Sequence, residues 1–242
     1  MTENGPVTWP LPPDLPWPQF LRRLRHPAPP PGWLEAAAEL DEVRRRPLLL
    51  RWIAQHPRLS AHLRGRLLPT LPWRALAGIA QDASAHPQAR QHATERLNAL
   101  WPGLTMGERR SLAMAAPRQL WPLIWRNRDR RVLEAFLQHP RLGMENLEAL
   151  IQPPLTPAQA EALQASRWLE AVPVAHQVLV ALDRGLDNPD GGLVLGMASP
   201  WIKALPEEER LLAAARMINP ALRRMVRAWA VPRLEDGELD PR

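Results

Sequence analysis

Apolar residues recur along most of this chain at the spacing of one face of an α-helix. The clearest case is a proline-free stretch in which Ala89, Ala93, Leu97 and Leu100 form one apolar stripe and the positions between them are mainly polar. Short segments of this kind follow one another with few residues between them. The pattern predicts helices over 33–45, 47–56, 60–68, 73–82, 87–100, 106–115, 118–126, 130–138, 144–151, 157–166, 173–184, 190–198, 200–204, 207–217 and 220–230.

Prolines and small polar residues mark where many of these helices should begin. Proline is well tolerated at the first helical position, because its missing N–H would have no partner there and its φ angle is already helical. Several sites place a good cap side chain before such a proline, or a Glu or Gln three residues after a threonine, which is a capping box. These sites are Thr156-Pro157 with Gln159, Ser199-Pro200, Asn219-Pro220, and Thr105 with Glu108.

One pentapeptide occurs twice, and the apolar positions around it match. Gln-His-Pro-Arg-Leu stands at 55–59 and again at 138–142, an offset of 83 residues. This offset predicts two repeat units of the roughly 40 to 47 residues that HEAT and armadillo helical repeats have. The aligned apolar residues are Leu49, Leu50, Ile53, Ala54, Leu67 and Leu68 in the first copy and Val132, Leu133, Phe136, Leu137, Leu150 and Ile151 in the second.

The two ends of the chain differ from the repeated part. Residues 1–32 are dense in proline, which predicts an extended N-terminal arm, and we expect 18–25 within it to dock as a short helix on the first repeat. Residues 33–232 form the predicted helical repeat domain. Residues 233–242 are polar and acidic, which is typical of a solvated tail or of a cap for the last repeat.

Composition supports a helical protein of the cytoplasm. The chain is rich in Leu and Ala and has two Phe and no Tyr, which favours helix over sheet. It has no Cys, which excludes disulfides, thiolate metal sites, iron–sulfur clusters and cysteine nucleophiles, and which suits a reducing compartment. We expect neither a leader nor a membrane-spanning segment. The formal charge of +6 comes almost wholly from Arg, either through a GC-rich genome or because one face of the protein is basic.

Parts of the chain resemble bacterial HEAT-like proteins and leucine-rich-repeat-variant proteins. The likeness is carried by 104–113, Ala116-Pro117 and 128–142, and by 81–83 with 86–90. It implies a right-handed all-α solenoid of short antiparallel helix pairs. It also implies that Asp129, and Asp82 by analogy, opens and caps a helix, and that an Arg in the same turn forms a ladder along the array. The iron–sulfur module of some leucine-rich-repeat-variant proteins requires the cysteines that this chain lacks.

The histidines predict turns, and they do not predict a metal site. His26, His56, His86 and His139 each precede a proline, which restrains them to extended backbone and marks a helix boundary. The pairs that come closest to ligand spacing, His56/His62 and His86/His92, are six residues apart and so lie on different helix faces. We expect no metal and no cofactor.

A cluster of Trp and Arg is the candidate binding surface. Trp121 and Trp125 are one helical turn apart, and aromatic rings beside guanidinium groups suit base stacking and phosphate contacts. HEAT-like alkylpurine DNA glycosylases combine a Trp with a catalytic Asp one turn away, as at Trp125 and Asp129, but their tandem-Trp motif is missing here. The four arginines of the cluster are Arg126, Arg128, Arg130 and Arg131.

We find no phosphate-binding Gly-rich loop, nucleophile elbow or calcium-loop pattern in the sequence. We therefore predict a non-catalytic scaffold or adaptor that binds another protein through a solenoid face. The alternative is a nucleic-acid-binding HEAT-like protein, including a base-excision enzyme. A third interpretation is that the protein is a small subunit, which buries its proline-rich arm and its exposed Trp residues in a larger assembly.

Overall fold

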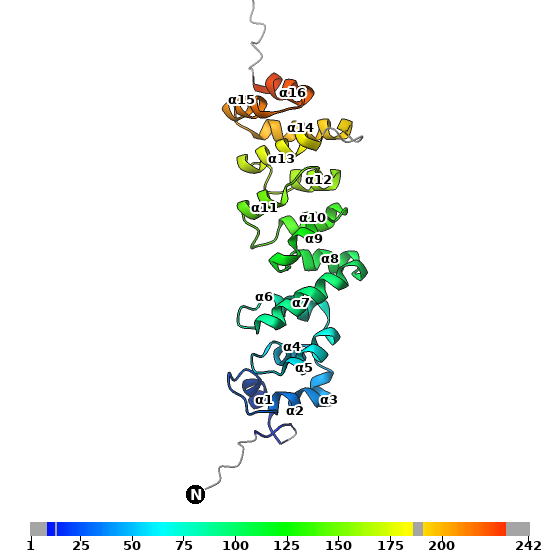
Figure 1. The fold of residues 1–242 in the computed structure, drawn as a ribbon, viewed down its shortest axis with the longest axis vertical. Helices are drawn as coiled ribbons and strands as arrows, with labels where there is room; N and C mark the ends of the chain where they lie inside the picture. The colour runs from blue at the N-terminus through cyan, green and yellow to red at the C-terminus, as the bar shows by residue number, and fades with distance from the viewer. Residues whose placement is uncertain (1–8, 13, 186–190, 231–242) are drawn as a thin grey trace, which may run out of the picture. The chain divides into compact units, whose positions relative to one another are not determined.

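The computed structural model describes residues 9–12, 14–185 and 191–230, and all regular structure in them is helical. Sixteen α-helices and three short 3-10 helices occur there, without a strand, so the predicted all-α class is confirmed (Figure 1). The helices are α1 (Trp17–Leu24), α2 (Trp33–Glu39), α3 (Asp41–Arg44), α4 (Pro47–Gln55), α5 (Ala61–Leu67), η1 (Leu68–Thr70), α6 (Trp73–Gln81), α7 (Pro87–Leu100), η2 (Trp101–Gly103), α8 (Met106–Ala113), η3 (Arg118–Leu120), α9 (Trp121–Trp125), α10 (Arg130–Leu137), α11 (Met144–Leu150), α12 (Pro157–Gln164), α13 (Val172–Gly185), α14 (Gly191–Ala204), α15 (Glu207–Arg216) and α16 (Pro220–Ala230).

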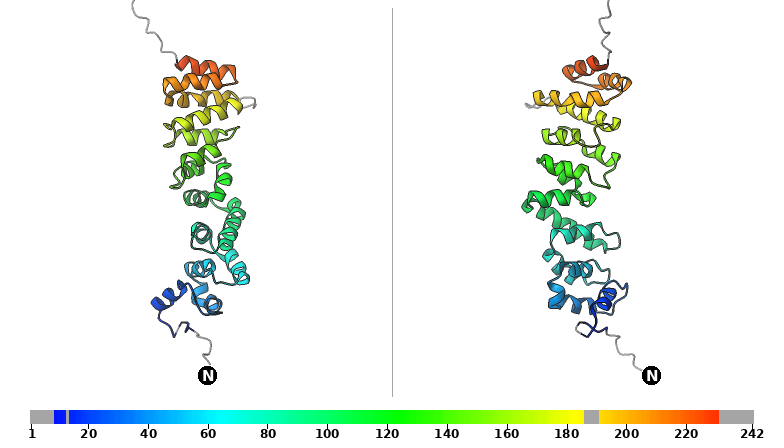
Figure 2. Two further views of the ribbon diagram at one scale, coloured as in Figure 1. Left: turned by 60° about the vertical axis from the view of Figure 1, so that its left-hand side comes forward. Right: turned by 180° about the vertical axis from the view of Figure 1, so that it is seen from behind.

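The chain divides into two compact units, Met1–Trp121 and Pro122–Arg242, here called unit 1 and unit 2. The repeat domain expected over 33–232 is thus divided between them, and the acidic tail 233–242 lies outside the described residues. In unit 1, α4 contacts both α2 and α6. In unit 2, α12 contacts α10 and α14, α14 contacts α16, and α11 contacts α13 (Figure 2). Within each unit, several helices therefore pack on the second-next helix along the chain.

The helix of the N-terminal arm docks on the first helices of unit 1, as predicted. Phe20 and Leu24 of α1 are fully buried, and the Phe20 ring centroid lies 5.6 Å from that of Trp33 in α2. The ring of Trp9 also packs edge-on against Trp33, at 5.5 Å. Because aromatic pairs of this geometry bury large apolar surfaces, they hold this part of the proline-rich arm on the core.

The two copies of the repeated pentapeptide have the same local structure. In each, the histidine Nδ1 accepts a hydrogen bond from the backbone N–H of the arginine two residues later, and both distances are 3.1 Å. Every apolar position aligned from the sequence has the same burial in the two copies, including Ile53 and Phe136, which are fully buried. The sequence repeat is therefore also a structural repeat.

The predicted length of the repeat is wrong. Three pairs of consecutive helices, and not two, lie between the start of α4 and the start of α10, because α4, α6, α8 and α10 begin at Pro47, Trp73, Met106 and Arg130. The steps are therefore 26, 33 and 24 residues. Helices of two to four turns joined by short loops need fewer residues per pair than the 40 to 47 expected of HEAT units.

Side-chain caps mark several of the helix starts. Thr105 and Thr156 form the predicted capping boxes with Glu108 and Gln159. The Asn219 side chain accepts hydrogen bonds from the backbone N–H groups of Ala221 and Leu222, as expected for the start of α16.

Two helix boundaries differ from the prediction. Ser199 caps nothing, because α14 continues through Pro200 to Ala204. The fully buried Trp201, which was expected at a helix start, lies inside this helix, and its packing favours the continuous helix over a break at the proline. The helix expected over 33–45 ends at Glu39, because Leu40 is extended.

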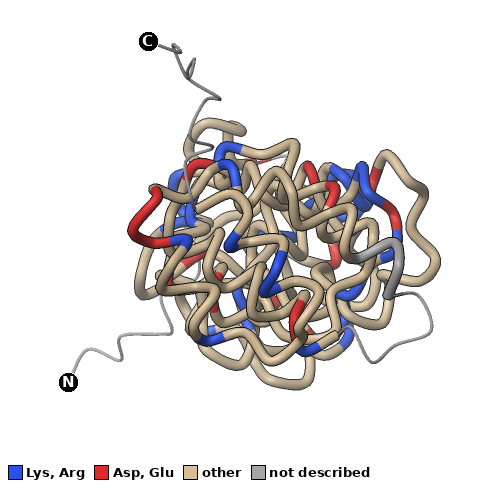
Figure 3. The backbone as a smooth tube through the Cα atoms, turned by 90° about the horizontal axis from the view of Figure 1, so that it is seen from above, with Lys and Arg blue, Asp and Glu red and all other residues tan. Residues whose placement is uncertain are grey.

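Two arginines have a structural role that accounts for part of the Arg bias. Each reaches back seven or eight residues to carbonyl groups at the end of the preceding helix, which need donors. Arg109 donates to the carbonyls of Trp101 and Pro102, and Arg210 to those of Ile202 and Lys203. Basic and acidic positions are interspersed along the backbone (Figure 3).

Unit 1 should become less stable as the pH falls, through His86. His86 caps α7, and its Nδ1 accepts the N–H of Gln88 at 3.2 Å. Burial, and then the positive charge of Arg64, lower the pKa of His86 below its ordinary value of 6.5. The unfolded chain then binds the proton more tightly, so the stabilisation is present above pH 6.5 and is lost as the pH falls through the lowered pKa.

The His86→Asn variant is the matched control, because Asn is also a good helix cap but does not titrate. The expected result is that the melting temperature falls less between pH 7.5 and pH 5.5 for this variant than for the natural chain. Equal falls for the two proteins would contradict the assignment.

Candidate functional site

The two tryptophans of the predicted surface are buried. Trp121 and Trp125 each expose only 4% of their surface. In unit 1, Trp121 Nε1 donates to the Ala116 carbonyl at 3.2 Å, and in unit 2 the Trp125 ring lies 6.3 Å from the Phe136 ring. The expectation of exposed rings for base stacking is therefore wrong. Their large apolar area belongs to the core of each unit, where it adds to stability.

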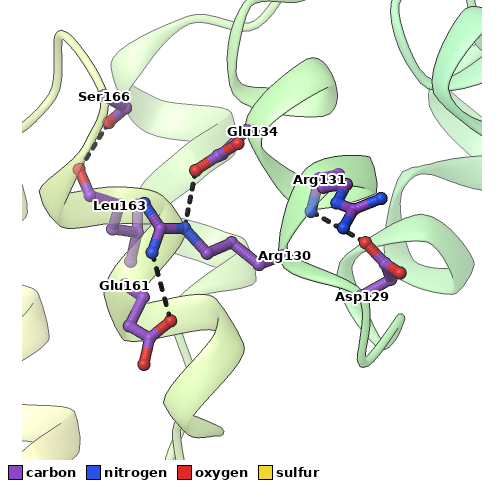
Figure 4. A network of polar contacts seen from close by, with 7 residues as sticks. All are labelled: Asp129, Arg130, Arg131, Glu134, Glu161, Leu163 and Ser166. Atoms are coloured by element: carbon purple, nitrogen blue, oxygen red, sulfur yellow. Dashed lines mark hydrogen bonds and ion pairs between the residues drawn. The ribbon is translucent and has the colours of Figure 1, made fainter.

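The arginines of that surface fall into two groups. Arg130 is paired within unit 2, with Nε 2.6 Å from Glu134 Oε1 and Nη1 3.4 Å from Glu161 Oε2 (Figure 4). The hydrogen bond to Glu134 is the main reason why the pKa of Arg130 is raised. The other three, which are exposed and have no ion pair to any described residue, remain candidates for anion contacts. They are Arg126, Arg128 and Arg131.

The two aspartates of the resemblance have different structural roles. Asp129 caps α10, because its Oδ1 accepts the N–H of Arg131 at 2.9 Å (Figure 4). Asp82 does not open a helix: it follows α6, and its Oδ1 accepts both the N–H and the hydroxyl of Ser84. With Trp125 buried and Asp129 engaged as a cap, the glycosylase-like pair lacks an accessible ring.

Unit 1 contains an open groove that was not expected from the sequence. It consists of two adjoining cavities of about 580 and 450 Å³ that share Arg51 and Asp82. The groove crosses α4 and α6, with the turn after α1 at one end and α8 at the other. We call it the Arg/Trp groove, after Arg25, Arg51, Trp52, Trp73, Arg74 and Asp82.

In the groove, an arginine guanidinium group lies over each of two half-buried tryptophan rings. The Cζ atom of Arg25 lies 4.1 Å from the centroid of the Trp52 ring, and that of Arg74 lies 5.2 Å from the Trp73 ring. Such cation–π contacts position a guanidinium while leaving its N–H donors available. The mixture of aromatic and basic groups that was expected around Trp121 is thus found here.

Arg51 is positioned by a glycine. The guanidinium lies over Gly78 of α6, and a Cβ at position 78 would be only 2.3 Å from Arg51 Cζ. Arg51 Nε is buried without a hydrogen-bond partner, and so is Oε1 of Gln55, one turn further along α4. Both atoms are inaccessible to solvent, so they are unsatisfied polar atoms inside this wall of the groove.

Carboxylates also lie in or beside the groove, and they stay ionised at neutral pH. The hydrogen bond from the Ser84 hydroxyl is the largest cause of the lowered pKa of Asp82, and Arg51 contributes. Hydrogen bonding from the Thr105 backbone is the largest cause of the lowered pKa of Glu108, which also accepts Trp73 Nε1 at 3.2 Å. The groove and its edge therefore contain charges of both signs.

Unit 2 has a counterpart of the groove in which a carboxylate stands at the position of Arg51. At the 83-residue offset, Glu134 stands where unit 1 has Arg51, and Gln138 stands where unit 1 has Gln55. Both residues line a cavity of about 460 Å³ together with Ala162 and Ser166. Arg130 pairs with Glu134 there. Of the two sites, only the one in unit 1 presents an arginine with an unused donor at this position.

One signal in the sequence points to the groove. Arg51-Trp52 and Trp73-Arg74 are adjacent Arg and Trp residues on neighbouring helices, and no Asp or Glu lies three or four residues from either Arg. By contrast, Arg130 has Glu134 four residues later, at ion-pair spacing. An arginine next to Trp without an acidic partner on its own helix is therefore the more informative pattern.

Among the described residues, no cluster of three or more side chains suited to a metal ion occurs, and no helix has both the length and the apolar character needed to cross a membrane. Comparisons of the chain with protein-family models, with curated proteins and with solved structures found no match.

Proposed function

We propose that this protein is a non-catalytic scaffold with a right-handed, HEAT-like α-solenoid fold, whose Arg/Trp groove binds a segment of another protein. Contacts between several helices and the second-next helix, as between α4 and α6 or α12 and α14, support the solenoid. Solenoids of this kind bind partners along extended faces that run across successive helices. We propose the cytoplasm of a bacterium as its location, on the basis of the composition and the resemblance.

The observation that carries the proposal is the accessible pair of tryptophan rings in an open groove. Trp and Arg are the residues that most often dominate protein–protein binding energy. Here Trp52 and Trp73 are half-buried and next to arginines that are not neutralised within their own helices. The carboxylate of Asp82 is occupied by Ser84, which suits a structural role better than proton transfer.

A second candidate function is nucleic-acid binding through unit 2. Arg126, Arg128 and Arg131 are exposed, and several arginines within six residues suit phosphate contacts. The burial of Trp125 leaves this surface without the stacking ring that single-stranded nucleic acid would use.

Photo-cross-linking in the native host distinguishes the two functions. The photoreactive amino acid p-benzoylphenylalanine in place of Ser111, an exposed residue of the groove, should give protease-sensitive protein adducts. The same amino acid in place of Gln91, an exposed residue in a different cavity of unit 1, should not. Nuclease-sensitive adducts from position 128, with none from position 111, would favour the nucleic-acid function instead.

A further inference from the structure

We infer that the Arg/Trp groove binds an extended acidic peptide segment, whose carboxylates contact Arg51 and Arg74 and whose apolar side chains lie on the rings of Trp52 and Trp73. This inference rests on the proposed function and names the chemical class of the partner.

The charge of the groove favours carboxylates. Arg25, Arg51 and Arg74 contribute three positive charges, against the single negative charge of Asp82 among the groove's defining residues. Guanidinium groups bind carboxylates with two parallel hydrogen bonds, which gives geometric specificity as well as energy. Arg25 and Arg74 are exposed and Arg51 is half-buried, so their guanidinium groups can be reached from the groove.

The acidic groups disfavour a nucleic-acid ligand at this site. Asp82 is shared by both cavities, and Glu108 lies at the edge, on Trp73 Nε1. Both carboxylates have a lowered pKa and are ionised at neutral pH. A continuous run of phosphates would meet them, whereas a peptide can place an uncharged residue at each.

The test is fluorescence anisotropy with the full-length protein at low salt. The probe is a fluorescein-labelled ten-residue peptide that alternates Glu with Leu, and its Gln-for-Glu form is the control peptide. We expect Arg51→Glu, which installs the residue found at 134, to weaken binding by about tenfold or more. Arg126→Glu makes the same charge change outside the groove and should weaken binding by about twofold at most.

The Gly78→Ala variant distinguishes a loss of binding in the groove from a loss of folding. The added Cβ must displace the Arg51 guanidinium, so we expect several-fold weaker binding. Alanine is also the better helix former, so the melting temperature should stay the same or rise. This combination cannot be produced by simple misfolding.

Three outcomes would overturn the inference: no binding of the Glu peptide at millimolar concentration, equal binding of the Gln peptide, or equal losses from Arg51→Glu and Arg126→Glu. Tighter binding of a dT10 oligonucleotide through Arg51 would also overturn it. If the Glu peptide does not bind while p-benzoylphenylalanine at position 111 still cross-links to protein, only the proposed acidic character of the partner is wrong. If the peptide does not bind and position 111 gives no protein adduct, the proposed function is wrong as well.

Discussion

Asp183→Ala is expected to lower the free energy of unfolding of unit 2 by about 3 kcal/mol, because one carboxylate anchors the start of a helix from a distance. Asp183 lies in α13 and is 8% exposed. Its two oxygens accept the backbone N–H groups of Ile218 and Asn219, both at 2.8 Å. Alanine would leave both donors without a partner just before α16, and a hydrogen bond to a charged group contributes about 1.5 to 3 kcal/mol.

The measurement is urea unfolding followed by circular dichroism, with Asp183→Asn and Asp129→Ala as matched variants. Asn keeps the size of the side chain and one acceptor oxygen, so it should recover about half of the loss. Asp129 accepts one local N–H at the start of α10, so its removal should cost about 1 kcal/mol, as for an ordinary cap. An Asp183→Ala loss no larger than that of Asp129→Ala would show that the long-range cap adds nothing.

These two aspartates show which parts of the fold the sequence could predict. The role of Asp129 as a cap depends only on residues within one turn and was expected from the sequence, as were the caps at Thr105, Thr156 and Asn219. The role of Asp183 depends on groups 35 and 36 residues away. No local pattern carries that information, because it exists only after the helices have packed.

The prediction of the repeat length was wrong for a similar reason. The copied pentapeptide marks one type of turn, which recurs where a helix ends in His-Pro-Arg-Leu. The helix pairs between the two copies, such as α6 with α7, do not carry the pentapeptide although they belong to the same series. An offset between identical turns gives a whole number of pairs, but it does not say how many.

For the candidate site, the kinds of residue were predicted better than their positions. Trp next to Arg does characterise the groove, but at Trp52 and Trp73 and not at Trp121 and Trp125. Whether a ring faces solvent depends on which helices pack against its own helix, and sequence spacing leaves this open. The absence of an acidic residue one turn from Arg51 was visible in the sequence and would have pointed to the groove.

The second large effect on stability is expected at the two histidine turns, which contain His56 in unit 1 and His139 in unit 2. The same substitution can be tested in each unit. In both copies the residue after the histidine is proline, which has no N–H, so the first backbone donor of the turn belongs to the following arginine. Nδ1 of His56 and Nδ1 of His139 accept these N–H groups, those of Arg58 and Arg141. Leucine at either histidine position is expected to cost about 2 kcal/mol, since a part-buried donor loses its acceptor.

Asparagine at the same positions separates hydrogen bonding from packing. Its side-chain oxygen can accept the N–H two residues later, as in Asx turns, although it is smaller than imidazole and fills less of the buried space. We therefore expect each Asn variant to be more stable than its Leu counterpart in urea unfolding. Leu variants as stable as the Asn variants would mean that the copied histidines are kept for their bulk, and that the hydrogen bond does not hold the turn.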